Sequence, residues 1–190
     1  DLIGVTDSVL PANAKISFSG QSKEYYESGS SLEITILFAI LIVYLVLAAQ
    51  FESFRNPLAI ILTVPIALTA GLYTLFLTGT SINVYSQIGF LMLIGLITKN
   101  GILVVEFANQ LRKKGMSVDE AIFESSLIRL RPVLMTTIST LLGAVPLVMS
   151  SGAGAESRYS MAIVVLGGIT LSSLITLYLV PALYRLIESR

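Results

Sequence analysis

The sequence predicts an all-α membrane protein with five membrane-spanning helices and one amphipathic helix lying along the membrane surface. Of the 190 residues, 54% are hydrophobic and only 13% are charged, which is typical of a membrane protein rather than a soluble domain. The charges are also unevenly placed, because four stretches contain none: residues 34–51, 56–98, 132–155 and 159–184. A helix needs roughly 20 mostly apolar residues to cross a bilayer, so the second stretch is long enough for two crossings and the others for one each.

The first 31 residues have a different composition. They are polar and too few to build a core of their own. We expect residues 1–31 to be the C-terminal remnant of a soluble domain and residues 32–190 to form the transmembrane domain. The chain begins at Asp1 without an apolar leader, so we expect it to be a piece of a longer protein.

Proline and polar residues mark the limits of the spans. Pro57 stands after a polar loop, at a position where proline commonly opens a helix. Pro65 lies inside the second span, where neighbouring helices of a membrane bundle can satisfy the freed carbonyl. The expected spans cover residues 32–50, 58–77, 84–111, 132–148 and 161–183.

The connection between the third and fourth spans predicts the surface helix. Ser117 and Glu120 form a capping-box pattern at its start. Apolar and acidic residues then alternate with helical spacing, so we expect an interfacial helix over residues 118–130. Whether it continues into the fourth span depends on Pro132, since the residue before a proline is biased away from helix.

The distribution of Lys and Arg sets the orientation. Lys15, Lys23 and Arg158 fall on one side of the five crossings, and Lys99 falls inside a span. The other side holds eight basic residues: Arg55, Arg112, Lys113, Lys114, Arg129, Arg131, Arg185 and Arg190. By the positive-inside rule, the N-terminal remnant lies outside the membrane and the C-terminus is cytoplasmic.

The composition excludes several functions. A formal net charge of +0 leaves no basic surface for nucleic acid. The chain has no Cys and no His, so it offers no disulfide, thiolate or imidazole chemistry and no zinc cluster. No Ser, Lys or Asp forms a nucleophile–base set of recognisable spacing, which disfavours an intramembrane hydrolase. We expect neither an enzyme nor a bound metal or cofactor.

Lys99 is the most informative residue of the chain. It lies about 16 residues after the start of the third span and 13 before Arg112, which is roughly 20 Å from either end of the helix. A charge at that depth costs at least a few kcal/mol without a partner and is usually functional. A static buried ion pair is the alternative.

Other polar residues share the third span with Lys99. Asn100 follows it directly, and Gly95 and Glu106 lie within about 40° of it on a helical wheel. Gly95 would let another helix approach the lysine. Glu106 is seven residues away, about 10 Å along the axis, so a charge near the cytoplasmic interface is the alternative to a role beside Lys99.

The fourth span carries a second polar stripe. Arg129, Thr136, Thr140 and Gly143 fall within about 40° of one another if the helix is continuous. Thr136 could instead bond only to its own backbone, and Arg129 could only mark the interface. In the fifth span, Gly167 and Gly168 favour close helix contact.

Several of these segments carry a resemblance to a known family. They are GLITKNGILVVEFA at residues 95–108, RLRPVLMTT at 129–137 and GAVPL at 143–147, supported by QFESF at 50–54 and GAGA at 152–155. The chain resembles the resistance-nodulation-division (RND) multidrug efflux pumps, in their hydrophobe/amphiphile (AcrB-like) branch. The resemblance covers nearly the whole chain.

The resemblance implies a fold and a mechanism. The chain would be the last five helices of an RND-type twelve-helix bundle, and residues 1–31 the end of a periplasmic porter domain. The pump would be a drug/proton antiporter, with protons as the coupling ion and no other cofactor. Lys99 would pair with two aspartates in the N-terminal half and shift toward Thr136 when they are protonated. Arg129 and Asn100 would belong to the same relay.

The resemblance also implies partners. The full-length protein would form a homotrimer in the bacterial inner membrane, with a periplasmic adaptor and an outer-membrane channel. The fragment alone is not expected to transport, because it lacks the aspartate-bearing helix and the porter domains. Two alternatives remain: a heavy-metal exporter or protein-export auxiliary of the same superfamily, and a non-transporting membrane scaffold with Lys99 in a static pair.

Overall fold

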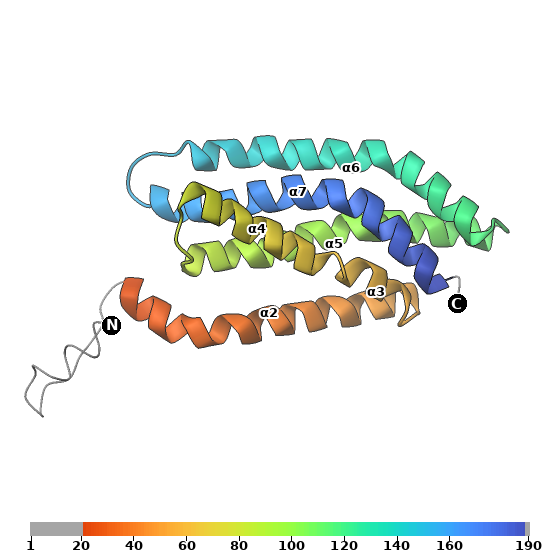
Figure 1. Cartoon of the computed structure of the whole chain (residues 1–190), viewed down its shortest axis with the longest axis horizontal. Coiled ribbons are helices and arrows are strands. Elements are labelled where there is room, and N and C mark those ends of the chain that lie inside the picture. Colours follow the sequence, from red (N-terminus) through yellow and green to blue (C-terminus); the bar gives the residue numbers. More distant parts are fainter. Residues whose placement is uncertain (1–20, 189–190) are drawn as a thin grey trace, which may run out of the picture.

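The computed structural model describes residues 21–188, and helices are the only regular secondary structure in that range (Figure 1). The elements are α2 (Gln21–Phe51), α3 (Asn56–Ile61), α4 (Val64–Thr78), α5 (Val84–Lys113), α6 (Val118–Val148) and α7 (Ala155–Glu188). Within the described part, five segments are long and apolar enough to cross a membrane: 34–51, 56–78, 84–113, 118–148 and 155–188. The predicted all-α class and the number of spans are therefore confirmed.

The N-terminal boundary is less distinct than the sequence suggested. Residues 1–20 of the expected soluble remnant lie outside the described residues. Residues 21–31 belong to α2, which continues into the first span without a break. The division of the chain at residue 31 thus stays a prediction.

The second span is two helices rather than one. The span expected over residues 58–77 is present at 56–78, but its helix is interrupted, because α3 ends at Ile61 and α4 begins at Val64. Pro65 has no N–H to donate to the carbonyl of residue 61, and its ring crowds that turn. The Thr63 side chain stabilises this interruption, because its Oγ1 donates a hydrogen bond to the Ile60 carbonyl at 2.6 Å.

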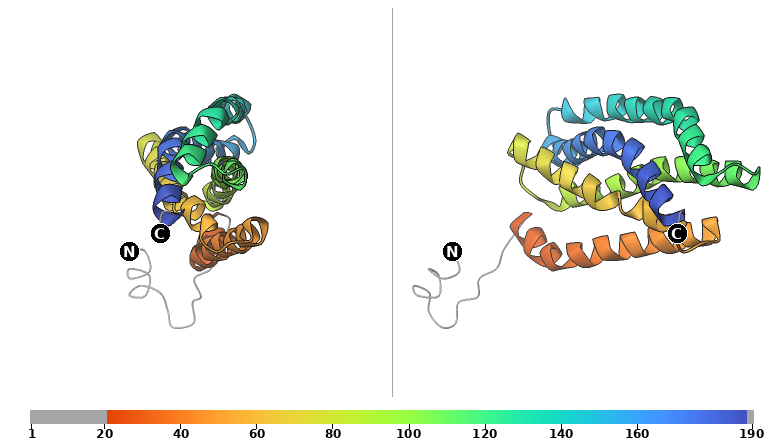
Figure 2. Two further views of the ribbon diagram at one scale, coloured as in Figure 1. Left: turned by 90° about the vertical axis from the view of Figure 1, so that its right-hand side faces the viewer. Right: turned by 45° about the vertical axis from the view of Figure 1, so that its right-hand side comes forward.

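The predicted surface helix and the fourth span are one helix. Residues 118–130 and 132–148 both lie in α6, with Pro132 in its interior, so their separation into two elements is wrong and the helix does not break before Pro132. The Ser117–Glu120 capping box is confirmed. A proline inside a helix bends it without ending it when the flanking turns are held by packing, and Figure 2 shows that α6 is strongly bent. The residues of the polar stripe, Arg129, Thr136, Thr140 and Gly143, therefore belong to one helix.

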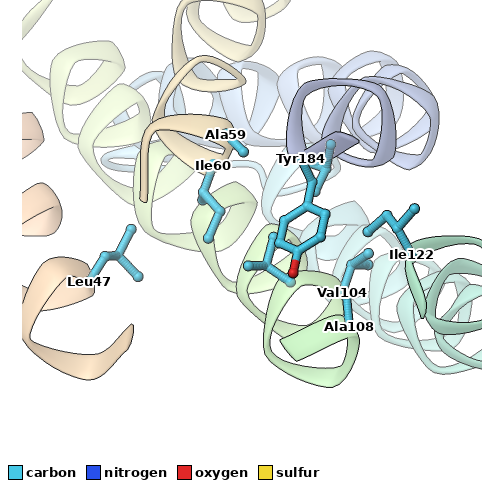
Figure 3. Close-up of a cluster of buried hydrophobic side chains, with 9 residues drawn as sticks. Leu47, Ala59, Ile60, Val104, Ala108, Ile122 and Tyr184 are labelled. Atoms are coloured by element: carbon cyan, nitrogen blue, oxygen red, sulfur yellow. The ribbon is translucent and has the colours of Figure 1, made fainter. Parts of the chain in front are cut away.

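The bundle is organised around α7. This helix packs against α3, α4, α5 and α6. Among the residues whose burial is described, two hydrophobic clusters stand out. One joins α4, α5 and α7 around Leu93 and Ile97. The other lies near the end of α7, where the ring of Tyr184 is fully buried among Ile60, Val104 and Ile122 (Figure 3).

Helix α2 lies along one side of the bundle (Figures 1 and 2). In the described part of the chain it packs against α3 and α5, and between residues 34 and 46 it exposes a run of apolar side chains, among them Leu37, Phe38, Leu41, Ile42, Leu45 and Val46. Exposed apolar surface of this extent is typical of a face that meets lipid or another protein segment.

Candidate functional site

Lys99 lies in the middle of α5. This 30-residue helix is capped at its start by the side chain of Asn83 and has Arg112 and Lys113 in its last turn. The Lys99 side chain is exposed on the surface of the bundle. Among the described residues the ion pairs are Arg112–Glu188 and Arg185–Asp119, and neither includes Lys99. An ammonium at mid-helix thus has no anion beside it among the side chains that the structure describes, residues 34–188.

A small cavity of about 30 Å³ lies beside Lys99. Side chains of three helices line it: Leu96, Lys99 and Asn100 from α5, Thr136, Thr137 and Thr140 from α6, and Ile169 from α7. A water molecule needs about 10–15 Å³ of such space and two to four polar partners, so the cavity has room for one or two waters. The structure therefore brings together Lys99, Asn100, Thr136 and Thr140, which are up to 41 positions apart in the chain.

The threonines of the cavity bond mainly to the backbone of their own helix. Thr136 Oγ1 donates to the Val133 carbonyl at 3.0 Å, and Thr140 Oγ1 donates to the Thr136 carbonyl at 2.8 Å. Thr137 is buried, and its hydroxyl lies 3.4 Å from that of Ser173 on α7. A hydroxyl that donates to a carbonyl still has lone pairs to accept with. The Thr136 oxygen can therefore accept a bond from an ammonium or a water.

Arg129 lies on the same face of α6, seven residues before Thr136. Its guanidinium carbon is 4.6 Å from the centroid of the Phe107 ring on α5, a distance at which a cation is attracted to an aromatic face. Its Nε is buried and has no hydrogen-bond partner among the described residues. Arg129 thus contacts α5 about 10 Å from Thr136 along the helix, and it does not line the Lys99 cavity.

Glu106 lies in a different place from Lys99. It accepts a hydrogen bond from Gln110 Nε2 at 3.2 Å. It also lines a polar cleft of about 590 Å³ whose other residues are Gln50, Phe51, Glu52, Asn56, Asn109, Gln110, Arg112, Lys113, Gly115 and Met116. This cleft is at the end of the bundle that carries Arg55, Arg112, Lys113, Lys114 and Arg185, which we call the basic end. Glu106 thus lies toward the basic end of the bundle, away from the Lys99 cavity.

The four glycines singled out in the sequence fall into two groups. A Cβ added at Gly167 would overlap with the side chain of Thr74, and one added at Gly168 would overlap with that of Leu93. Side chains of α4 and α5 therefore pack directly against the backbone of α7 at these two glycines. At Gly95 and Gly143 nothing lies within 4 Å of such a Cβ. These two glycines leave open space on the side of α5 and α6 that carries Lys99 and Thr136.

Several polar contacts between helices could not be predicted from the sequence. Tyr184 donates a hydrogen bond to Asn109 Oδ1 at 2.6 Å, and Ser125 donates to the Val104 carbonyl at 2.6 Å. The ion pairs Arg112–Glu188 and Arg185–Asp119 join α7 to α5 and α6 at the basic end. The partners are between 21 and 76 positions apart, and no local pattern links them.

The chain is similar to a known family of proteins. The model of the AcrB/AcrD/AcrF family matches residues 4–188. The chain is 44% identical over 176 residues to the multidrug resistance protein MdtC of Erwinia amylovora, covering 92% of the chain and 17% of the relative. It is 39% identical over 181 residues to MdtC of Escherichia coli, covering 95% and 18%.

An uncharacterized transporter of Haemophilus influenzae is also similar, at 38% identity over 187 residues, which is 95% of the chain and 18% of the relative. The chain thus spans less than a fifth of the length of these relatives.

Proposed function

Because the chain belongs to the AcrB/AcrD/AcrF family, we propose that it is a transmembrane part of a multidrug efflux transporter driven by protons. Two kinds of observation support this. The five apolar spans suit a multi-pass membrane protein, and relatives at 39–44% identity are described as multidrug resistance proteins. A transporter of this kind is not an enzyme, and its coupling ion would be the proton, with no other cofactor.

The proposed coupling group is Lys99, and one observation carries the proposal. Its side chain lies halfway along α5 on an uncovered face, with Thr136 across a small cavity. In a membrane crossed by α5, this position would be at mid-depth. An ammonium at that depth requires a counter-anion. Gly95 and Gly143 leave open space on either side, so a further helix could approach to backbone contact. We propose that this helix belongs to the N-terminal half of the protein and carries an Asp pair.

Proton binding would then act by shifting Lys99 between two sets of partners. When the aspartates are ionised, they hold the ammonium by charge. When they are protonated, that attraction weakens, and Lys99 turns toward the oxygen of Thr136 and the water in the cavity. Asn100 lines the same cavity and can bond to this water. Arg129, on the same face of α6, would couple the change to the basic end through its contact with Phe107.

We further propose an orientation and an assembly. The basic end would face the cytoplasm, as the positive-inside rule requires, and the N-terminal part would be periplasmic. The full-length transporter would act in the inner membrane as a homotrimer, with a periplasmic adaptor and an outer-membrane channel. A scaffold with Lys99 in a static pair is the competing proposal.

Replacement of Lys99 in the full-length protein separates the two proposals. Lys99→Ala should reduce dye efflux to the level of cells that lack the transporter, while membrane expression stays at wild-type level. Lys114→Ala is the matched control, because Lys114 is exposed at the basic end and should keep full efflux. Wild-type efflux with Lys99→Ala would refute the relay and favour the scaffold.

A further inference from the structure

An apolar groove lies between α6 and α7, apart from the Lys99 cavity. Its volume is about 830 Å³, which is within the range of sites that hold small molecules. Apolar side chains make up most of its lining, and a charged pair stands at one end. The residues are Asp119, Ile122, Phe123, Ser126, Leu127, Leu130, Leu134, Leu174, Leu177, Tyr178, Pro181, Ala182 and Arg185.

The length of the groove matches one leaflet of a bilayer. On α7 it extends from Leu174 to Arg185, about 16 Å at 1.5 Å per residue, and on α6 most of it lies before the bend at Pro132, between Asp119 and Leu130, also about 16 Å. Half of the hydrocarbon core of a bilayer is about 15 Å thick. A lipid chain that enters at the basic end could therefore lie along the apolar part of the groove.

Asp119 and Arg185, the charged pair at one end of the groove, can form further hydrogen bonds besides those to each other. Arg185 Nε lies 2.7 Å from Asp119 Oδ1, and Arg185 Nη2 lies 3.0 Å from Oδ2. The two side chains are nevertheless 65% and 60% exposed. A guanidinium has five N–H groups, of which two are used here, and a carboxylate can accept about four hydrogen bonds. A cation beside Asp119 and an anion beside Arg185 could both be bound without breaking the pair.

The neighbouring carboxylate and guanidinium favour one type of phospholipid headgroup. A phosphate alone would gain from Arg185 but would be repelled by Asp119. A quaternary ammonium has no N–H to donate to the carboxylate. A primary ammonium next to a phosphate supplies a donor for Asp119 and acceptors for Arg185, and charge-assisted hydrogen bonds of this kind are the stronger ones.

We propose that the groove between α6 and α7 binds a phospholipid with a primary ammonium in its headgroup, such as phosphatidylethanolamine. Its headgroup contacts Asp119 and Arg185, and one acyl chain lies along Phe123, Leu127 and Leu130. The inference depends on α6 and α7 spanning the membrane and is independent of proton coupling.

The test is lipid retention by the full-length transporter. The protein is reconstituted in nanodiscs with equal amounts of phosphatidylethanolamine, phosphatidylcholine and phosphatidylglycerol of identical acyl chains, and bound lipid is counted by native mass spectrometry. The wild type should retain phosphatidylethanolamine over the other two. Asp119→Asn should reduce this preference over phosphatidylcholine about five-fold, the upper end for one exposed charge pair.

Two further variants complete the design. Glu124→Gln, an exposed acidic residue of α6 outside the groove, should keep the wild-type preference. Leu130→Trp keeps both charges but fills the groove, so it should lower retention of the bound lipid whatever its headgroup. Equal retention of the three lipids by the wild type would overturn the proposal, as would an unchanged preference in Asp119→Asn.

A photoreactive amino acid in place of Leu127 tests for other occupants. It should crosslink to lipid. Crosslinking to another segment of the protein or to a second copy would show that protein covers the groove and would overturn the proposal.

Discussion

Replacing Gly168 with alanine should destabilise the bundle. The new Cβ would lie 2.3 Å and 2.8 Å from the two Cδ atoms of Leu93, well inside van der Waals contact. Leu93 is fully buried in the cluster shared by α4, α5 and α7, so its side chain has little room to move away.

The size of the effect follows from two opposing contributions. Adding a methyl group to a packed core costs about 1–3 kcal/mol, and replacing Gly by Ala in a helix recovers up to about 1 kcal/mol. We expect a net loss of about 1–2 kcal/mol. Leu93→Ala alone should cost about 2–5 kcal/mol, since it leaves a cavity. In the double variant the new methyl group occupies part of that cavity.

The assay is thermal unfolding of the full-length protein in detergent, followed by size-exclusion chromatography of heated samples. Each single variant should lower the unfolding midpoint, and the double variant should lose clearly less than the sum of the two. Additive losses would show that Gly168 and Leu93 are not in contact. A wild-type midpoint for Gly168→Ala would refute the packing of α7 on α5.

Two other predictions concern single polar groups. Thr136→Ala should reduce dye efflux only in part, because a water in the neighbouring cavity can replace the hydroxyl oxygen as acceptor; wild-type efflux over the accessible pH range would assign Thr136 a structural role. Tyr184→Phe should destabilise the protein by about 1–2 kcal/mol, because it removes the donor to Asn109 Oδ1. Tyr73→Phe is its control, since Tyr73 is 54% exposed, and an equal loss of thermal stability in both variants would contradict the prediction.

The prolines show how far the fold could be predicted. The spans followed from apolar length, because a backbone in lipid must satisfy its own hydrogen bonds and therefore forms helices. Yet Pro65 separates two helices, whereas Pro132 lies inside one. The sequence shows only that an N–H is missing at each position. Whether the helix ends or bends there depends on how its turns pack against the neighbouring helices.

The candidate site was predictable only in its individual residues. Lys99 could be identified because its depth is a count of residues along one helix. Its position beside Thr136, on the other hand, depends on how α5 and α6 are rotated about their axes. The contact of Arg129 with Phe107 and the bond between Tyr184 and Asn109 depend on the same rotation, so sequence reasoning could not find them.

By itself, the sequence determined the number of spans, the position of Lys99 halfway along its helix and the uneven distribution of basic residues, because each depends only on distance along the chain. Only the tertiary structure distinguished the four glycines. Thr74 packs against Gly167 and Leu93 packs against Gly168, whereas Gly95 and Gly143 face open space on the side of Lys99. The physical reason is that a glycine permits close approach, but which helix approaches is decided by the packing of the whole bundle.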